Sequence, residues 1–227
     1  LNGLCRIRIT RRKNAHSARN CQHCRDENEM KLLSGLLRHA KRRGQERDQA
    51  RSLYIASVEQ ARRPGFYTDC GVADSLDGRF DLIVLHVFLV LRALRPSGEP
   101  GKRLSDLMFK IMMDDMDMNL REMGVGDLSV GKRVKSMARA FFGRAAAYDA
   151  AFDAEQGAAP GEAGEDGLEA ALRRNIYGAD EPESGEIEKL LEYARRAEAA
   201  LAAEPEEALL SGRVIFPDAP GDSSASK

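Results

Sequence analysis

Five residues near the N-terminus have side chains that could bind a metal ion: Cys5, His16, Cys21, His23 and Cys24. Two of the cysteines have the C-x-x-C spacing of half a zinc site, but a second pair at the spacing of a zinc finger is missing. A histidine lies between these two cysteines and not after the second, so the segment does not match a haem attachment motif either. We therefore predict no metal ion and no cofactor for this chain.

Two stretches resemble ligand-binding loops but depart from them at defining positions. Residues 126–132, GDLSVGK, follow the phosphate-binding pattern, but Arg133 replaces the Ser or Thr whose hydroxyl binds magnesium. The stretch also follows an expected helix and not a strand. Residues 115–119, DMDMN, begin like a calcium loop, with Leu120 at the position that requires glycine. We interpret the first stretch as a turn between helices and predict no nucleotide or calcium site.

His86 is the one residue of catalytic interest in the body of the chain, which otherwise contains His39 and a single cysteine, Cys70. It lies in the middle of an apolar run, and no nucleophile–base pair or metal-ligand spacing accompanies it. Such a histidine is more often buried and hydrogen-bonded to a neighbouring helix than catalytic. The sequence therefore predicts no catalytic residues, and the protein does not read as an enzyme.

The stretch around His86 predicts the central element of the fold. Between residues 82 and 91 every residue except His86 is apolar, which leaves no polar face for water. Ten apolar residues fall well short of the roughly 20 that span a bilayer, so the element is expected to be buried in protein. Its length favours a helix over a strand, and Pro96 would end it. We predict an all-α protein, a single-domain irregular helical bundle packed around a buried central helix at about 76–95.

Composition and charge limit the partners that the chain can have. There is no tryptophan, and aromatic residues make up 6% of the chain, which is typical of a mostly helical protein. Residues 1–63 carry sixteen basic against six acidic residues, a net charge of +10, and residues 154–210 carry five against fifteen, a net charge of −10. The acidic segment at 154–210 argues against DNA as a partner. No transmembrane span or signal peptide is evident, so we expect a cytoplasmic protein.

We expect three parts along the chain. Residues 1–29 lack any helical or strand period, so we predict that they are disordered and interpret them as an over-extended reading frame whose natural start is Met30. Residues 30–217 form the helical domain, with a flexible loop at 153–167 that is rich in Gly, Ala and Glu. Residues 218–227 are expected to be a flexible C-terminal tail.

Three predicted helices carry side chains suited to binding. Seven of the eight methionines lie between residues 108 and 137, mostly in the helix predicted at 104–123, and flexible thioethers suit surfaces that accept varied apolar partners. The alternative is that these methionines fill the core. Residues 132–152 predict an amphipathic helix with a basic exposed face. Residues 31–43 combine leucines with basic residues, which fits a membrane or RNA contact or an ordinary docked helix.

Between residues 54 and 152 the chain resembles the ubiquinol–cytochrome c chaperone family, assembly factors of the cytochrome bc1 complex, in its short, alphaproteobacterial form. The strings that carry the resemblance are YIASVEQARRPGFY at 54–67, GVADSLDGRFD at 71–81, LHV at 85–87, MDMNLREMGVGD at 116–127, GKRVK at 131–135 and FFGR at 141–144. The resemblance implies a helical, non-catalytic protein that handles newly made cytochrome b before haem insertion and assembly. Mitochondrial members resemble ribosome-associated factors that work with a small partner protein.

The resemblance also selects candidate binding residues, because an apolar client must be shielded from water. For contact with the client or a partner we expect Phe66, Tyr67, Met112, Met116 and Met123. For electrostatic docking to anionic lipid or ribosomal RNA we expect Lys132, Arg133 and Lys135. This docking would place the protein peripherally at the inner face of the inner membrane.

Two alternatives remain open at the level of sequence. One is a helical binder of a small apolar ligand, a quinone, haem or lipid, near His86. The other is a peripheral membrane adaptor anchored by residues 31–43.

Overall fold

The computed structural model describes residues 41–157, 167–178 and 181–222, and no strand occurs in these ranges. The chain divides into two compact units, Leu1–Gly44 and Gln45–Lys227, and the helical bundle belongs to the second. The first helix of the described residues covers 41–61, and its residues from 45 onward belong to this second unit. The elements that follow are α2 (Gly65–Thr68), α3 (Leu76–Leu94), the 3-10 turn η1 (Arg95–Ser97), α4 (Gly98–Glu122), α5 (Asp127–Gly157), α6 (Leu168–Leu172), the π-helical turn η2 (Arg173–Tyr177), α7 (Ser184–Ala202) and α8 (Glu206–Leu210). The all-α prediction is confirmed.

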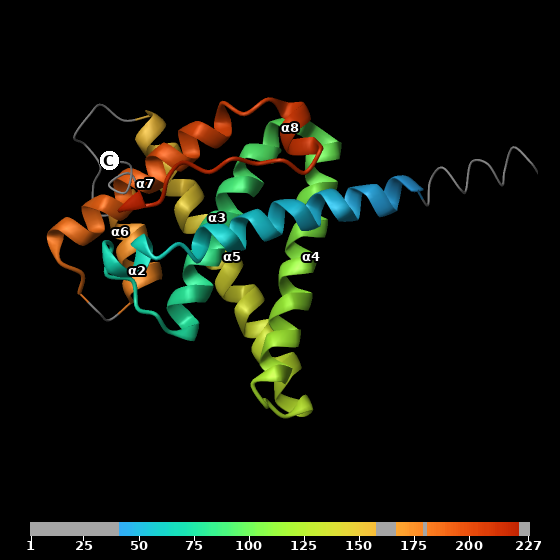
Figure 1. Ribbon diagram of the computed structural model, residues 1–227, viewed down its shortest axis with the longest axis horizontal. Coiled ribbons are helices and arrows are strands. Elements are labelled where there is room, and N and C mark those ends of the chain that lie inside the picture. The colour runs from blue at the N-terminus through green and yellow to red at the C-terminus, as the bar shows by residue number, and fades with distance from the viewer. Residues whose placement is uncertain (1–40, 158–166, 179–180, 223–227) are drawn as a thin grey trace, which may run out of the picture. The chain divides into compact units, whose positions relative to one another are not determined.

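Helix α3 lies at the centre, as the apolar run predicts. Every residue from Phe80 to Val90 is buried, and α4, α5, α7 and α8 all pack against this helix (Figure 1). The side chain of Ser75 caps its start by accepting a hydrogen bond from the backbone N–H of Gly78 at 3.1 Å. Because the helix presents apolar groups on all sides, it requires cover from neighbours on all sides.

Residues 96–101, rich in proline and glycine, are helical, with η1 followed directly by α4. Helix α4 begins at Gly98, and Pro100 occupies its first turn. Backbone N–H groups in the first turn have no partner within the helix, so a proline there breaks no helical hydrogen bond. Gly101 is buried beside the end of α3, and a Cβ at this position would lie 2.1 Å from the carbonyl oxygen of Leu94. The glycine therefore allows α3 and α4 to meet closely.

Helix α5 is longer than the predicted range of 132–152 at both ends. Its C-terminal extension to residue 157 takes five residues from the predicted loop at 153–167, and residues 158–166 lie outside the described part of the chain. The extension is held by its own side chains, since Glu155 pairs with Arg195 of α7 at 2.7 Å and Gln156 donates to Glu198 at 3.2 Å. Composition alone did not reveal these contacts between helices.

The C-terminal segment packs against the bundle further than predicted. Residues 213–222 run beside the first helix, where Gln60 donates a hydrogen bond to the carbonyl oxygen of Pro217 at 3.0 Å (Figure 1). The carbonyl of Pro220 lies so close to Gly65 that a Cβ there would be 1.5 Å from its oxygen. Asp222 pairs with Arg63 at 2.8 Å. Residues 218–222 of the predicted tail are therefore in contact with the bundle, and residues 223–227 lie outside the described part of the chain.

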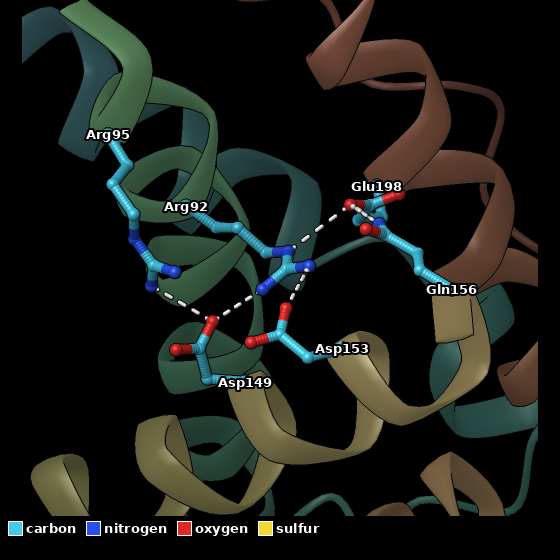
Figure 2. A network of polar contacts seen from close by, with 6 residues as sticks. All are labelled: Arg92, Arg95, Asp149, Asp153, Gln156 and Glu198. Atoms are coloured by element: carbon cyan, nitrogen blue, oxygen red, sulfur yellow. Dashed lines mark hydrogen bonds and ion pairs between the residues drawn. The ribbon is translucent and has the colours of Figure 1, made fainter. Parts of the chain in front are cut away.

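One arginine at the end of α3 joins three helices. Figure 2 shows Arg92 reaching Asp149 and Asp153 of α5 and Glu198 of α7, the latter two at 2.8 and 3.2 Å. Arg95 adds a contact to Asp149 at 2.9 Å. The Arg92 side chain is only 11% exposed, whereas that of Arg95 is 57% exposed. Arg92 is therefore the interior member of this network, and Arg95 is its solvated edge.

Replacing Arg92 by Leu should lower the free energy of unfolding by about 2 to 3 kcal/mol, because partly buried Glu198 would lose its cation and Asp149 would keep only exposed Arg95. The matched change at Arg95 should cost below about 0.5 kcal/mol, since an exposed ion pair contributes little. Urea denaturation of both variants measures the difference. Equal effects would show that burial does not set the value of these contacts.

Candidate functional site

A cavity of about 370 Å³ lies between the first half of α3, the last turns of α4 and the first half of α5. Its wall is mostly apolar, with a small number of charged or polar groups, as is usual for binding sites in proteins. The apolar part is formed by Leu76, Phe80, Met116, Leu120, Met123, Met137 and Ala140. The polar part is formed by Asp77, Asp81, Asn119, Arg133, Ser136 and Arg144.

The sequence of α4 explains how one wall forms. Its buried residues recur mainly every four positions, so that Met108, Met112, Met116 and Leu120 lie on one face of the helix. The helix ends at Glu122, and Gly124 follows it with a φ of +79°, which is favourable only for glycine. The N–H of Val125 donates back to the carbonyl of Leu120 at 3.0 Å. This turn lets α5 run back beside α4 (Figure 1). Side chains of α5 complete the wall of the cavity.

A buried ion pair forms the polar end of the cavity. Arg144 of α5 lies 2.8 Å from Oδ1 of Asp81, and the two side chains are 23% and 9% exposed. The guanidinium also lies over the ring of Phe80, 5.8 Å from its centroid, and its Nε donates to the carbonyl of Asn175 at 3.4 Å. Burial raises the pKa of Asp81 to about 7, although the charge of Arg144 favours the carboxylate.

Hydrogen bonding in this cluster is incomplete among the described residues. Three buried atoms have no hydrogen-bond partner there: Oδ1 of Asp81, the hydroxyl of Tyr148 and Nδ2 of Asn175. The contact between Arg144 and Asp81 is thus close in distance but lacks the geometry of a hydrogen bond. Unmade hydrogen bonds cost stability in a protein interior, so charge and packing, more than hydrogen bonds, hold this cluster together.

The structure separates the five candidate client residues. Phe66 and Met112 have no exposed surface, so burial excludes direct contact with a partner in this conformation. Tyr67 is half-buried, and its hydroxyl donates to the carbonyl of Ala61 at 3.0 Å, away from the cavity. Met116 and Met123 both line the cavity; Met116 is buried and Met123 is 53% exposed. Helical spacing predicted which methionines share a face, but not which of them α3 and α5 cover.

The three basic candidates lie on the exposed side of α5. Lys132, Arg133 and Lys135 are all exposed, and Arg133 also lines the cavity. The structure thus brings Arg133 together with Met116 and Met123 at the cavity. The two aromatic candidates of α2, Phe66 and Tyr67, do not line it. Asp81 and Arg144, which complete the site, escaped the sequence analysis as site residues. An acid at the edge of an apolar run was the one available signal for Asp81.

His86 is a fully hydrogen-bonded core residue. Gln60 donates to the hydroxyl of Tyr193 at 3.0 Å, and this hydroxyl lies 2.8 Å from Nε2 of His86. Nδ1 of the imidazole lies 2.8 Å from the carbonyl of Leu82, so the ring donates from Nδ1 and accepts at Nε2. Phe66 and Phe216 pack against the ring, with centroids 5.2 and 5.3 Å away. The expectation of a buried histidine bonded to a neighbouring helix is confirmed.

Burial lowers the pKa of His86 to about 4. The unfolded state therefore binds the proton more tightly, and the stability contributed by the neutral ring is lost as the pH falls from about 6.5 to about 4. A His86→Gln variant has no imidazole to protonate and so lacks this loss of stability. The difference in unfolding free energy between the unaltered protein and the variant should therefore change by about 3 kcal/mol between pH 7 and pH 4.

Both proteins contain Asp81, whose opposite pH dependence cancels in the comparison of His86 with its Gln variant. Urea denaturation across this pH range gives the free energies, and NMR titration of the His86 ring gives the pKa directly. A titration midpoint near 6.5 would contradict this account.

No helix among the described residues has the length and apolar character needed to cross a membrane. In the same residues, His, Cys, Asp and Glu side chains form no group of three or more that could hold a metal ion.

Comparison with known proteins identifies relatives of this fold. Residues 68–216 match the sequence profile of the family described as ubiquinol-cytochrome C chaperone. A protein of Xenopus laevis named ubiquinol-cytochrome-c reductase complex assembly factor 1 is 25% identical over 165 residues, which are 72% of this chain and 78% of the relative. The Mus musculus protein of that name is 26% identical over 163 residues, 71% of this chain and 52% of the relative. The match thus spans about half the length of the mouse protein.

A crystal structure has the same architecture. The Cbp3 homolog from Brucella abortus superposes with a TM-score of 0.68 at 32% sequence identity, and the match covers 81% of this chain and 97% of that one.

Proposed function

The chain belongs to the ubiquinol-cytochrome C chaperone family, and from that premise we propose that it is a non-catalytic assembly chaperone for the cytochrome bc1 complex that binds newly made cytochrome b. The observation that carries the proposal is the family match over residues 68–216, together with relatives named as assembly factors of ubiquinol-cytochrome c reductase. Binding, and not chemistry, is the activity that such a role requires.

The surface around the cavity supports an apolar client. Two large apolar side chains beside the turn between α4 and α5 are exposed, Met123 by 53% and Leu128 completely. Leu76, 49% exposed, adds to them at the cavity. Exposed apolar groups that gather in one place are typical of interaction sites, and methionine suits a surface that accepts more than one apolar shape. We propose that cytochrome b contacts this surface through Met116 and Met123.

Basic residues beside this surface support a second contact. We propose that Lys132, Arg133 and Lys135 attract an anionic surface, either the inner face of the inner membrane or ribosomal RNA, where newly made cytochrome b is found. A small partner protein, as in the mitochondrial relatives that the sequence resembles, would then join the complex from another side. The protein would act in the cytoplasm or peripherally on the membrane.

The two alternatives have less support. A haem or quinone held by His86 would have to displace hydrogen bonds at both ring nitrogens and the rings of Phe66 and Phe216. The anchor expected at residues 31–43 falls mainly on residues 31–40, which lie outside the described part of the chain.

A photocrosslinking amino acid at Met123 should capture cytochrome b in cells, mainly before the bc1 complex is assembled. The reason is that this exposed side chain lies at the mouth of the cavity. Mass spectrometry of the crosslinked product identifies the captured protein. The same probe at fully buried Met112 should yield only crosslinks within the chain. A probe at Ile215, which is 73% exposed, serves as a surface control. Capture from Ile215 but not from Met123 would place the client elsewhere.

Replacing Lys132, Arg133 and Lys135 together by Glu should reduce cosedimentation with ribosomes or with vesicles that contain anionic lipid by at least about tenfold at 0.1 M salt. Three reversed charges would each lose about 1 kcal/mol or more of attraction at such a surface. The triple Glu variant of exposed Arg47 and Arg51 on the first helix and Arg62 just after it changes charge equally and should bind as the unaltered protein does. Unchanged cosedimentation of the first variant with both targets would refute the docking role.

A further inference from the structure

One exposed face of α5 carries a row of basic side chains with a large apolar side chain at each end. The five residues of the row follow one another at spacings of four, three, four and three, so they lie on one face of the helix. We call this row the α5 stripe; it consists of Leu128, Lys132, Lys135, Arg139 and Phe142, all of them exposed. From the rise of an α-helix, its two apolar ends lie about 21 Å apart.

The apolar ends of the α5 stripe leave most of their surface in water. Leu128 is completely exposed, and residues 121–129 around it are all exposed except half-buried Val125. Phe142 is 58% exposed, although its ring is held in place by Phe109 and Phe141, with centroids 4.9 and 5.5 Å away. A helix face that joins large apolar side chains to basic ones is typical of helices that lie in a membrane interface.

The charge of α5 indicates an anionic partner. Residues 128–148 contain five basic residues and no acidic one. Arg144 of this set pairs with Asp81, whereas the three basic residues of the α5 stripe form no ion pair with a described residue. A partner without negative charge would cover these three cations and give them no counter-charge in return.

The apolar ends favour a lipid surface over the other anionic partners. The phosphates of RNA would satisfy the basic residues but leave Leu128 in water, because an aliphatic side chain cannot stack on bases as an aromatic ring does. A folded protein would need two apolar pockets about 21 Å apart with acidic residues between them. A bilayer presents anionic headgroups above hydrocarbon at every point of its surface, so it can meet the whole row at once.

The cavity lies on a different side of α5. Its α5 wall is formed by a second row of residues: Arg133, Ser136, Met137, Ala140 and Arg144. At 3.6 residues per turn, the centres of the two rows are separated by about 130° around the helix axis. A membrane that contacts the α5 stripe would therefore leave the mouth of the cavity accessible to a client.

We propose, building on the electrostatic docking suggested above, that the α5 stripe lies against an anionic lipid bilayer. Its two apolar ends enter the hydrocarbon beneath the headgroups, and its three basic residues contact the headgroups themselves. The inference selects lipid from the two anionic surfaces considered for docking, and it adds Leu128, Arg139 and Phe142 to the contact.

Tryptophan fluorescence tests the insertion directly. The chain contains no tryptophan, so one introduced tryptophan reports on its own position. Full-length Leu128→Trp and Phe142→Trp proteins are mixed with vesicles of phosphatidylcholine that contain about one-third phosphatidylglycerol. Emission should shift to the blue at both positions, and bromine atoms on the acyl chains should quench it. An Ile215→Trp protein, altered at a residue that is 73% exposed in the C-terminal segment, should show neither effect. Unchanged emission at position 128 or 142 would overturn the inference.

Two further variants separate the apolar contact from the charged one. Leu128→Ser with Phe142→Ser should weaken partitioning onto these vesicles by at least about tenfold, because two large apolar side chains no longer leave water. Gln in place of Lys132, Lys135 and Arg139 should also weaken it by at least about tenfold, and so should an increase in salt from about 0.1 M to about 1 M.

The matched control replaces Arg47, Arg51 and Arg62 by Gln, which removes the same charge elsewhere and should leave partitioning unchanged. All these substitutions affect exposed side chains, and circular dichroism checks that the helices are retained. Loss of binding in the Gln variant of the α5 stripe but not in the double Ser variant would indicate adsorption by charge alone and would overturn the insertion.

The outcome can be separated from that of the proposed function. Binding to ribosomes through the basic residues, with both tryptophans unaffected by vesicles, would overturn the inference and leave electrostatic docking to RNA standing. Capture of cytochrome b from Met123 without vesicle binding would overturn the inference and leave the assembly role standing. Insertion of both tryptophans without capture from Met123 would support the α5 stripe and overturn the client contact at the cavity.

Discussion

The burial of α3 on all its sides is the constraint on which the other elements depend. An uncharged apolar run of this length has no face that water can solvate, so its helix becomes stable only when other helices remove that surface from water. Helices α4, α5 and α7 provide most of this cover, and α2 with the C-terminal segment closes the side near His86. The amphipathic character of these other helices follows from the same requirement, since each needs one apolar face only.

Three polar residues of α3 show three solutions to burial. His86 lies at the middle of the helix and is satisfied completely, by its own backbone and by Tyr193. Arg92 lies near the end, where its guanidinium serves acids on two neighbouring helices and remains in partial contact with solvent. Asp81 lies near the start and has a cation but an incomplete set of hydrogen bonds. Asp81 and Arg92 both line cavities, so a neighbouring cavity does not by itself distinguish a structural polar group from one that binds a partner.

In the assembly role proposed above, recognition of a client would rest on the cavity and on the apolar side chains beside the turn between α4 and α5. An assembly factor must hold a partner long enough to protect apolar surface and must then release it. In that role, methionines at the mouth would provide adaptable contact, and basic residues on the adjoining face of α5 would supply attraction that depends on salt. These two kinds of contact act over different distances, because charge attraction extends to about 10 Å and apolar contact requires touching surfaces.

The amino-acid sequence by itself determined the class of fold, the buried helix at 76–94 and the family, because hydrophobic period, length and unusual strings are properties of neighbouring residues. It also excluded nucleotide and calcium loops through single defining positions such as Arg133 and Leu120. Tertiary structure decided which methionines are core, since Met112 and Met116 are buried whereas Met118 and Met123 of the same cluster are exposed. It decided the length of α5 as well, which depends on ion pairs with α7, and it brought Asp81 to Arg144, 63 residues further along the chain. Such contacts arise from the packing of helices, and no local pattern of residue types records which faces will meet.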